Sequence, residues 1–292
     1  MALRKTDGAI LCPSCKKLID ADEPKCPHCG MLQPGLFGFG HWLGFLFGGR
    51  TDLVAGVIIV CVALYAATLA LDVRSISFGG LLSLLSPSNE ALYTFGMTGG
   101  EAWRQGHWWT MTTSTFLHGG LLHLGFNMLW LRYLGPTVMK ELGPSRFLVI
   151  FMLTGILGSL ASNLYGVYFM GGTPWPSIGA SGGVFGLIGV LLAFGRRRGG
   201  AWGRSLAGRM AFWALIAGGI GFVLPGVNNV AHLGGLASGF ALGYLMPRFE
   251  GSKESATVQL IAVALVALTL VGIVLSIVLM YPIMFGATTD PW

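Results

Sequence analysis

The stretch LVAGVIIVCVALYAATLAL, residues Leu53–Leu71, contains no charged side chain. It has about the 20 residues that a helix needs to cross the hydrocarbon core of a bilayer. Further apolar stretches of similar length follow it along the chain. The expected spans are Leu53–Leu71, Thr115–Leu134, Phe147–Phe169, Gly179–Gly195, Met210–Leu224, Val230–Met246 and Gln259–Tyr281. Repeated spans of this kind predict an all-α polytopic membrane protein.

The composition of the 292 residues agrees with this interpretation. Hydrophobic residues make up 53% and charged residues only 10%, whereas a typical soluble domain has about 25% charged residues. The mean hydropathy is +0.70. So few charges cannot cover a soluble globule. The composition also excludes a disordered chain, a coiled coil and a secreted scaffold held by disulfides.

The net charge of +6 is explained by membrane topology. If the N-terminus lies in the cytoplasm, all but two of the 18 lysines and arginines fall in cytoplasmic segments, and only Arg74 and Arg104 lie outside. An excess of Lys and Arg in cytoplasmic loops is usual in multi-pass proteins. We therefore expect no nucleic-acid partner, a cytoplasmic N-terminus and an outside C-terminus, in a bacterial inner (plasma) membrane. The first 35 residues contain no apolar segment of the signal-peptide type.

Two C-x-x-C motifs lie near the N-terminus, Cys12-Pro-Ser-Cys15 and Cys26-Pro-His-Cys29. Each motif brings two thiolates toward one ion, and together they complete a tetrahedral structural Zn²⁺ site. Redox-active or disulfide-forming cysteines are the alternative, but the cytosol expected around this segment is reducing. A segment of about 30 residues also has too small a core to fold without a metal. His28, inside the second motif, is expected at the surface and not as a ligand.

This segment resembles the zinc-ribbon heads of many bacterial proteins, a likeness that indicates the metal and not the purpose. Its positive and negative charges balance between the first and last cysteine, which argues against a phosphate-binding finger. The expected organisation is a cytosolic zinc ribbon at 1–35, a Gly/Phe-rich linker at 36–52 and a six-helix core at 53–247. Residues 248–292 then supply a cytosolic loop, a seventh transmembrane helix and a short outer tail.

Few polar side chains lie inside the expected spans, and each is a candidate functional residue because burying an ionisable group in a bilayer is costly. They are His118, His123 and His232, with Asn127 as the notable amide. No Asp or Glu falls within a span, which excludes a carboxylate-based proton pump and an intramembrane aspartyl protease. No H-E-x-x-H motif exists for a metalloprotease. Histidine acting together with a hydroxyl group remains.

Ser181 supplies a hydroxyl group at the start of the fourth span, in the sequence Gly179-Ala180-Ser181-Gly182-Gly183. Glycines this dense usually serve helix packing, so the motif alone is weak evidence for a catalytic serine. His232, however, opens the sixth span. The two residues are therefore expected at the same depth, about one turn below the outer surface.

A G-x-x-x-G pair, Gly235 and Gly239, follows His232 on the sixth span and predicts a close partner helix. The glycine-rich face near Ser181 supplies one. Two packed helices that carry Ser and His at equal depth form a plausible nucleophile–base pair. No intramembrane carboxylate is available to orient the base, and Phe185, one turn below Ser181, could hold the imidazole ring by stacking instead.

His123 and Asn127 lie on one face of the second span, because they are four residues apart. Both are expected in its outer half, near the depth of Ser181. One interpretation is a hydrogen bond that holds two helices together. The convergence of these polar positions with Ser181 favours the other interpretation, in which they are donors aimed at a developing oxyanion.

Four motifs occur in order along the chain: Phe116-Leu117-His118, His123-Leu124-Gly125-Phe126-Asn127, Gly179-Ala180-Ser181-Gly182, and Ala231-His232-Leu233-Gly234-Gly235 with Gly239 following. They resemble the ordered signatures of the rhomboid intramembrane serine proteases, over roughly Leu53–Met246. The resemblance implies a six-helix bundle with Ser181 as nucleophile and His232 as general base. It also implies an oxyanion hole formed by His123, Asn127 and the Ser181 backbone N–H, with His118 as structural support. The last span makes this the variant with one extra C-terminal helix.

One departure from the family pattern lies in the long outer loop, Asp72 to Trp109. Many relatives carry Trp-Arg shortly before the Phe116-Leu117-His118 motif, whereas here Thr110 stands in the place of the Arg. Arg104 follows a Trp as well, but six residues earlier. The departure concerns how that loop is anchored and not the Ser181–His232 pair.

The activity that the resemblance implies is hydrolysis of peptide bonds in or near transmembrane helices. The partners would be transmembrane segments of protein substrates and the lipid bilayer, and catalysis would need no metal or organic cofactor. A substrate helix must unwind locally, because its backbone carbonyls are hydrogen-bonded within the helix. Two alternatives stay open: a catalytically inactive relative that binds transmembrane clients, and a transporter or channel with histidine as proton relay.

Overall fold

The computed structural model describes residues 8–12, 15–20, 23, 25–30, 52–80, 83–246 and 256–286. The chain divides into two compact units, Met1–Gly56 and Val57–Trp292. Most of the expected linker, the loop that precedes the last helix and the end of the chain lie outside the described residues.

The first unit contains a small antiparallel sheet. Strand β1 (Ala9–Leu11) pairs with β2 (Leu18–Asp20), with Ile10 opposite Ile19. The buried cluster beside this sheet consists of Ile19, Cys12 and Cys26. Among the described residues of this unit, so few buried apolar side chains contribute little hydrophobic stabilisation, which agrees with the expectation that so small a segment needs a metal to fold.

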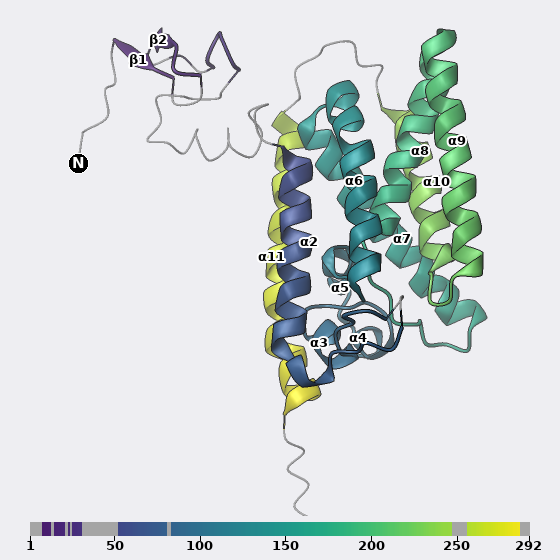
Figure 1. Ribbon diagram of the computed structural model, residues 1–292. Helices are drawn as coiled ribbons and strands as arrows, with labels where there is room; N and C mark the ends of the chain where they lie inside the picture. The colour runs from purple at the N-terminus through teal and green to yellow at the C-terminus, as the bar shows by residue number, and fades with distance from the viewer. Residues whose placement is uncertain are drawn as a thin grey trace, which may run out of the picture. The chain divides into compact units, whose positions relative to one another are not determined.

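The second unit is a helical bundle (Figure 1). Its long helices are α2 (Leu53–Leu71), α6 (Leu121–Leu142), α7 (Pro144–Phe169), α8 (Ser181–Arg198), α9 (Gly200–Val223), α10 (Asn229–Leu245) and α11 (Ala256–Phe285). Each expected span overlaps one of them, so the helical architecture is confirmed. Short helices fill the connection between α2 and α6: η1 (Val73–Ser75), α3 (Asn89–Thr94), α4 (Gly100–Arg104), α5 (Thr110–Thr113) and η2 (Ser114–Phe116).

Among the described residues, four helices are long and apolar enough to cross a membrane by length and composition alone: α2, α7, α9 and α11. Helix α10 is too short at 17 residues, α8 ends in three arginines, and α6 carries several polar and charged side chains. These three helices also carry the candidate site residues.

The second expected span is displaced along the chain. Helix α6 begins at Leu121 instead of Thr115, and it continues beyond the expected end to Leu142. Gly119 and Gly120 separate η2 from α6, and glycine is a poor helix former. The expectation treated an apolar run as one helix, whereas the two glycines turn its first part into a separate segment.

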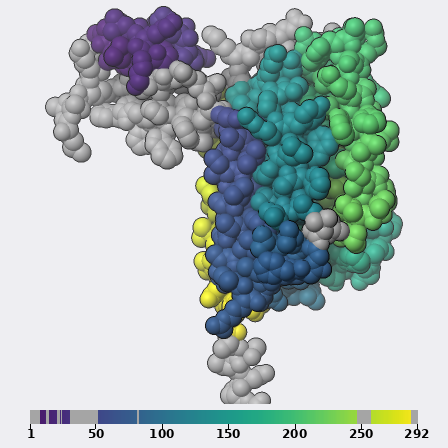
Figure 2. All heavy atoms as spheres, viewed as in Figure 1, coloured from purple at the N-terminus to yellow at the C-terminus, as the bar shows by residue number. Residues whose placement is uncertain are grey.

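Helix α8 lies at the centre of the bundle, where most of its side chains are buried. It packs closely against α10: a Cβ atom on Gly235 would overlap the carbonyl oxygen of Gly182, and one on Gly239 would overlap that of Gly186. The predicted close approach of these two helices is therefore present. In the space-filling view, α2, α6 and α9 form much of the face turned toward the viewer (Figure 2).

Candidate active site

Ser181 is the first residue of α8, and its Oγ atom lies 2.8 Å from Nε2 of His232 on α10. His232 sits in the first turn of α10, where its backbone N–H donates to the carbonyl of Asn228. The glycines that let α8 and α10 approach so closely are the reason that two short side chains on different helices meet. The structure thus brings together the serine and histidine that the sequence singled out.

The imidazole of His232 is held by stacking. Its ring lies parallel to that of Phe185 on α8, with centroids 4.4 Å apart and planes 14° apart. Its second nitrogen, Nδ1, is buried and has no hydrogen-bond partner among the described residues. Packing, and not a carboxylate, therefore fixes the orientation of this ring.

His123 approaches Ser181 from α6. Its Nδ1 accepts a hydrogen bond from the Gly119 backbone N–H at 3.4 Å, so a neutral imidazole carries its proton on Nε2. This Nε2 faces Gly179: a Cβ atom built there would lie 2.6 Å from Nε2 and 3.7 Å from the Ser181 Oγ atom. An N–H donor thus points into the space beside the serine hydroxyl.

Asn127 lies one helical turn beyond His123 and is 5% exposed. Its Nδ2 donates to the backbone carbonyl of His123 at 2.8 Å. A side-chain amide carries two N–H donors, so one donor remains for a further partner. The contact also ties Asn127 to the turn that positions the His123 ring.

His118 is fully buried, and its ring meets the His123 ring edge-on at a centroid distance of 5.1 Å. In the part of the chain that the structure describes, neither of its ring nitrogens has a hydrogen-bond partner. Its contact with the site is therefore packing against His123.

Asn228 is a residue that sequence reasoning missed. Its Oδ1 caps α10 by accepting from the Ala231 backbone N–H at 3.0 Å, while its Nδ2 donates to Ser162 on α7 and to Ser177 before α8. One amide thus connects three segments around the pair of Ser181 and His232. The available signal was an Asn directly before an apolar run, which is typical of a helix N-cap.

In the described part of the connection between α2 and α6, Arg104 forms a surface ion pair with Glu101 inside α4 at 2.7 Å. Thr110, in the position of the usual Arg, donates to the carbonyl of His107 three residues earlier. The neighbouring Trp109 makes the longer connection, through Nε1 to the hydroxyl of Ser276 on α11 at 3.1 Å.

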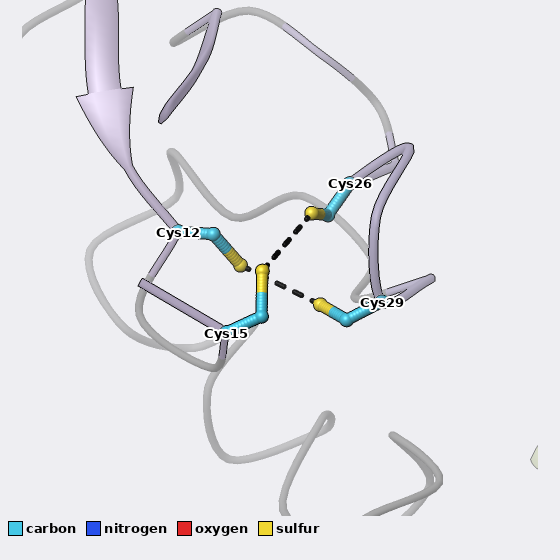
Figure 3. Close-up of side chains that lie close together, drawn as sticks. All are labelled: Cys12, Cys15, Cys26 and Cys29. Atoms are coloured by element: carbon cyan, nitrogen blue, oxygen red, sulfur yellow. Dashed lines mark hydrogen bonds between the residues drawn. The ribbon is translucent and has the colours of Figure 1, made fainter. Parts of the chain in front are cut away.

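The four N-terminal cysteines converge in the first unit (Figure 3). Their Sγ atoms lie within 4.8 Å of one another, with 3.6 Å between Cys12 and Cys29 and 3.8 Å between Cys15 and Cys26. Four thiolates at about 2.3 Å from one zinc ion lie about 3.8 Å apart at the corners of a tetrahedron. The arrangement fits a structural Zn²⁺ site.

The electrostatics around Cys26 favour a thiolate. Burial raises the pKa of its thiol, but hydrogen bonds from the backbone N–H groups of His28 and Cys29, with those of neighbouring thiols, outweigh that effect. The resulting pKa is about 7, below the ordinary 9.0. A thiol must be deprotonated to bind a metal, so these contacts favour metal binding near neutral pH.

Comparison with known proteins finds a family match in each of the two units. Residues 105–249 match the Rhomboid domain family, and residues 10–33 match a zinc-ribbon domain family. The putative rhomboid protease YdcA of Bacillus subtilis (strain 168) is 32% identical over 157 residues, which cover 52% of this chain and 71% of YdcA. The chain belongs to the rhomboid family.

Other rhomboid relatives are longer than the matching segment. The Rhomboid protease GluP of Bacillus subtilis (strain 168) is 36% identical over 183 residues, 61% of this chain but 35% of GluP. The RHOMBOID-like protein 4 of Arabidopsis thaliana is 34% identical over 171 residues, 56% of this chain and 40% of the relative. The chain therefore spans well under half of these two relatives. One similar protein, from Arabidopsis thaliana, is named Inactive RHOMBOID-like protein 8.

Membership of the rhomboid family, together with the apolar helices, makes this chain an integral membrane protein. The matched rhomboid segment contains α6 to α10 and hence Ser181, His232, His123 and Asn127. Helix α11 lies outside the matched segment.

Proposed function

We propose that this rhomboid protein is an intramembrane serine endopeptidase that cleaves peptide bonds in or near transmembrane helices of other membrane proteins. The observation that carries the proposal is the 2.8 Å distance between Ser181 Oγ and His232 Nε2. A hydroxyl within hydrogen-bond reach of an imidazole is the geometry of an activated nucleophile. The proposal agrees with the names of GluP and YdcA.

In the first step, the Ser181 Oγ atom attacks the carbonyl carbon of the substrate while His232 Nε2 accepts the hydroxyl proton. Stacking on Phe185 keeps the ring aligned in both protonation states. His232 then returns the proton to the leaving amine, which leaves an acyl-enzyme on Ser181. A water molecule, deprotonated by the same imidazole, hydrolyses this ester and restores the serine.

The negative charge that develops on the carbonyl oxygen needs hydrogen-bond donors. His123 Nε2–H and the second N–H of Asn127 are the side-chain donors that we assign to it. The backbone N–H of Ser181 is a third, because the first N–H groups of a helix have no partner within the helix. The positive end of the α8 dipole adds to the stabilisation.

The substrate that fits this site is a transmembrane segment of a single-pass protein. Its carbonyls are hydrogen-bonded within its own helix, so the segment must unwind before Ser181 can attack. Helix-destabilising or small residues near the end of the segment lower that cost. No metal or organic cofactor enters these steps.

The zinc-ribbon unit has a structural role in this proposal. Cys12, Cys15, Cys26 and Cys29 would hold one Zn²⁺, which supplements the small buried cluster of the described residues in this unit. We place this unit and the loop between the sixth and seventh spans in the cytoplasm, with the C-terminus outside a bacterial inner membrane, because of the distribution of Lys and Arg. The organisation into residues 1–35, 36–52, 53–247 and 248–292 is part of the same proposal.

The direct test is cleavage of a single-pass model substrate by the purified full chain in liposomes. Ser181→Ala and His232→Ala are each expected to abolish cleavage while the melting temperature stays near that of the wild type. Asn127→Ala is expected to retain more activity, because loss of one oxyanion donor costs about 10²–10³ in rate. Wild-type turnover by Ser181→Ala would contradict the proposal. Substrate binding without cleavage by the wild type would favour an inactive client-binding protein.

A further inference from the structure

Helix α11 turns a narrow polar and small-residue stripe toward the bundle. Its buried side of described residues contains Ala262, Thr269, Gly272, Ser276 and Met280, while apolar side chains on its other sides are exposed. A helix that only filled a lipid-facing position would not need buried hydroxyl groups, because a buried hydroxyl costs free energy unless it is hydrogen-bonded. The partners of these hydroxyl groups therefore indicate what the helix does.

Ser276 has its partner in Trp109, the residue before α5. The Thr269 hydroxyl donates to the Leu265 carbonyl within α11 at 3.0 Å and also lies beside α5. Trp109 Nε1–H donates to the Ser276 Oγ atom at 3.1 Å, and the hydroxyl oxygens of Thr269 and Thr112 lie 3.4 Å apart. Between these two contacts, Gly272 lets the helix approach: a Cβ atom there would be 3.0 Å from Thr113 Cγ2 and 3.3 Å from the Trp109 ring. Within the described residues, the side-chain hydrogen bonds from Trp109 and α5 to a long helix all go to α11.

The segment that α11 holds leads directly to the site. After α5, the carbonyl of Ser114 in η2 accepts a hydrogen bond from the Gly179 backbone N–H at 2.9 Å. Gly179 packs against His123 Nε2 and precedes Ser181 by two residues. A shift of η2 would therefore move both the serine and the imidazole that we assign to the oxyanion.

Other contacts of this segment are packing or local hydrogen bonds. Residues of η2 pack on α7, where the Phe116 and Phe151 ring centroids lie 6.0 Å apart. Thr110, in the position of the usual Arg, reaches only the carbonyl of His107, three residues earlier. Thr113 donates to the Gly96 carbonyl at 2.7 Å, which ties α5 to another part of the same connection. Neither contact links α5 to a membrane-spanning helix.

We propose that α11 is a brace for the active site, and that Ser276 and Trp109 are its positioning residues. By fixing α5 and η2, the brace sets the position of Gly179 and so the geometry between Ser181 and His123. The inference rests on the proposed function. It means that α11, which lies outside the matched Rhomboid domain, helps to position the catalytic residues.

The test compares Ser276→Ala, Trp109→Phe and the double variant of the full chain in liposomes. Each single variant removes one half of the hydrogen bond and keeps most of the packing. We expect kcat to fall by about tenfold with KM unchanged, below the roughly 10²-fold loss that follows a 1 Å misplacement. Because both variants break the same contact, the double variant should lose little more than either single variant. Ser276→Thr, which keeps the hydroxyl, should retain most of the activity.

Val278→Ala is the matched control, since Val278 lies on the same helix with 62% of its surface exposed. It should leave kcat unchanged. A brace that served stability alone would lower the melting temperature and leave kcat of the folded enzyme unaltered, and that result would overturn the inference. So would additive losses in the double variant. If the wild type itself fails to cleave, the proposed function falls and the inference falls with it.

Discussion

Gly179 adopts φ +125°, a backbone conformation that residues with a side chain rarely take, and its Cα faces the His123 ring. In the alanine variant the backbone would be strained at this φ, and the new Cβ atom would also overlap His123 Nε2. We predict that Gly179→Ala lowers kcat by about 10²-fold, the cost of a catalytic group displaced by about 1 Å. Steady-state cleavage of a model substrate measures this loss.

Gly171→Ala separates the two causes. Gly171 also has a positive φ, +84°, but nothing lies within 4 Å of a Cβ atom built there. Backbone strain alone should therefore reduce stability slightly and leave kcat nearly unchanged. Equal losses of kcat in both variants would show that contact with His123 is not what makes Gly179 necessary.

The candidate site could be read from the sequence at some residues and not at others. Ser181 and His232 stand out because polar side chains are rare in apolar spans. Asn228 is less evident, because an Asn before an apolar run indicates a helix N-cap and not a bridge between segments. Its importance comes from Ser162 and Ser177, distant in sequence, whose hydroxyls only the fold brings to its amide.

At the scale of elements, the relation between α8 and α10 depends on Asn228 at the start of α10. Its Oδ1 caps the helix and its Nδ2 binds two hydroxyls. Asn228→Asp keeps an acceptor for the cap and loses both N–H donors, whereas Asn228→Ala loses the acceptor and the donors. We predict a lower melting temperature for the alanine variant, corresponding to about 1 kcal/mol from the cap alone. Thermal unfolding in detergent measures it.

The aspartate variant tests the bridging role separately. It should unfold at a temperature between those of the alanine variant and the wild type. Its kcat should fall, because a carboxylate oxygen replaces the Nδ2 donors and the Ser162 and Ser177 hydroxyls would have to reorient to donate to it. An aspartate variant with wild-type kcat would mean that Asn228 acts as a helix cap and nothing more.

Helix existence was predictable because each span is a long apolar run, and a helix is the structure that satisfies its backbone in lipid. The first and last residues of the helices were less predictable. The start of α6 moved to Leu121 because Gly119 and Gly120 interrupt an apolar run. The short helices between α2 and α6 have no strong periodicity, and their packing against α11 depends on contacts that are remote in sequence, such as Trp109 with Ser276.

At the scale of the whole molecule, the zinc-ribbon unit and the bundle are expected to act independently. All the candidate catalytic residues lie in the bundle, and the four cysteines lie in the other compact unit. We predict that deletion of residues 1–35 leaves cleavage of a model substrate by the purified enzyme largely intact. Inactivation by the deletion, without loss of the bundle fold, would instead mean that the first unit is coupled to catalysis.

Metal analysis tests the same unit directly. The purified full chain should contain about one zinc per chain. Replacing Cys12 and Cys15 with serine removes two of the four thiolates and should abolish this content. A full chain without zinc would contradict the structural assignment of the cysteines.

The central claim is that Ser181 is a nucleophile activated by His232, and covalent labelling measures it most directly. A fluorophosphonate probe phosphonylates a serine only when its hydroxyl is activated by a neighbouring base. Peptide mass spectrometry of the labelled full chain should place the adduct on Ser181, and His232→Ala should remove it while the protein remains folded. Absence of the adduct from the wild type, or an adduct on Ser181 that persists undiminished in His232→Ala, would contradict the account.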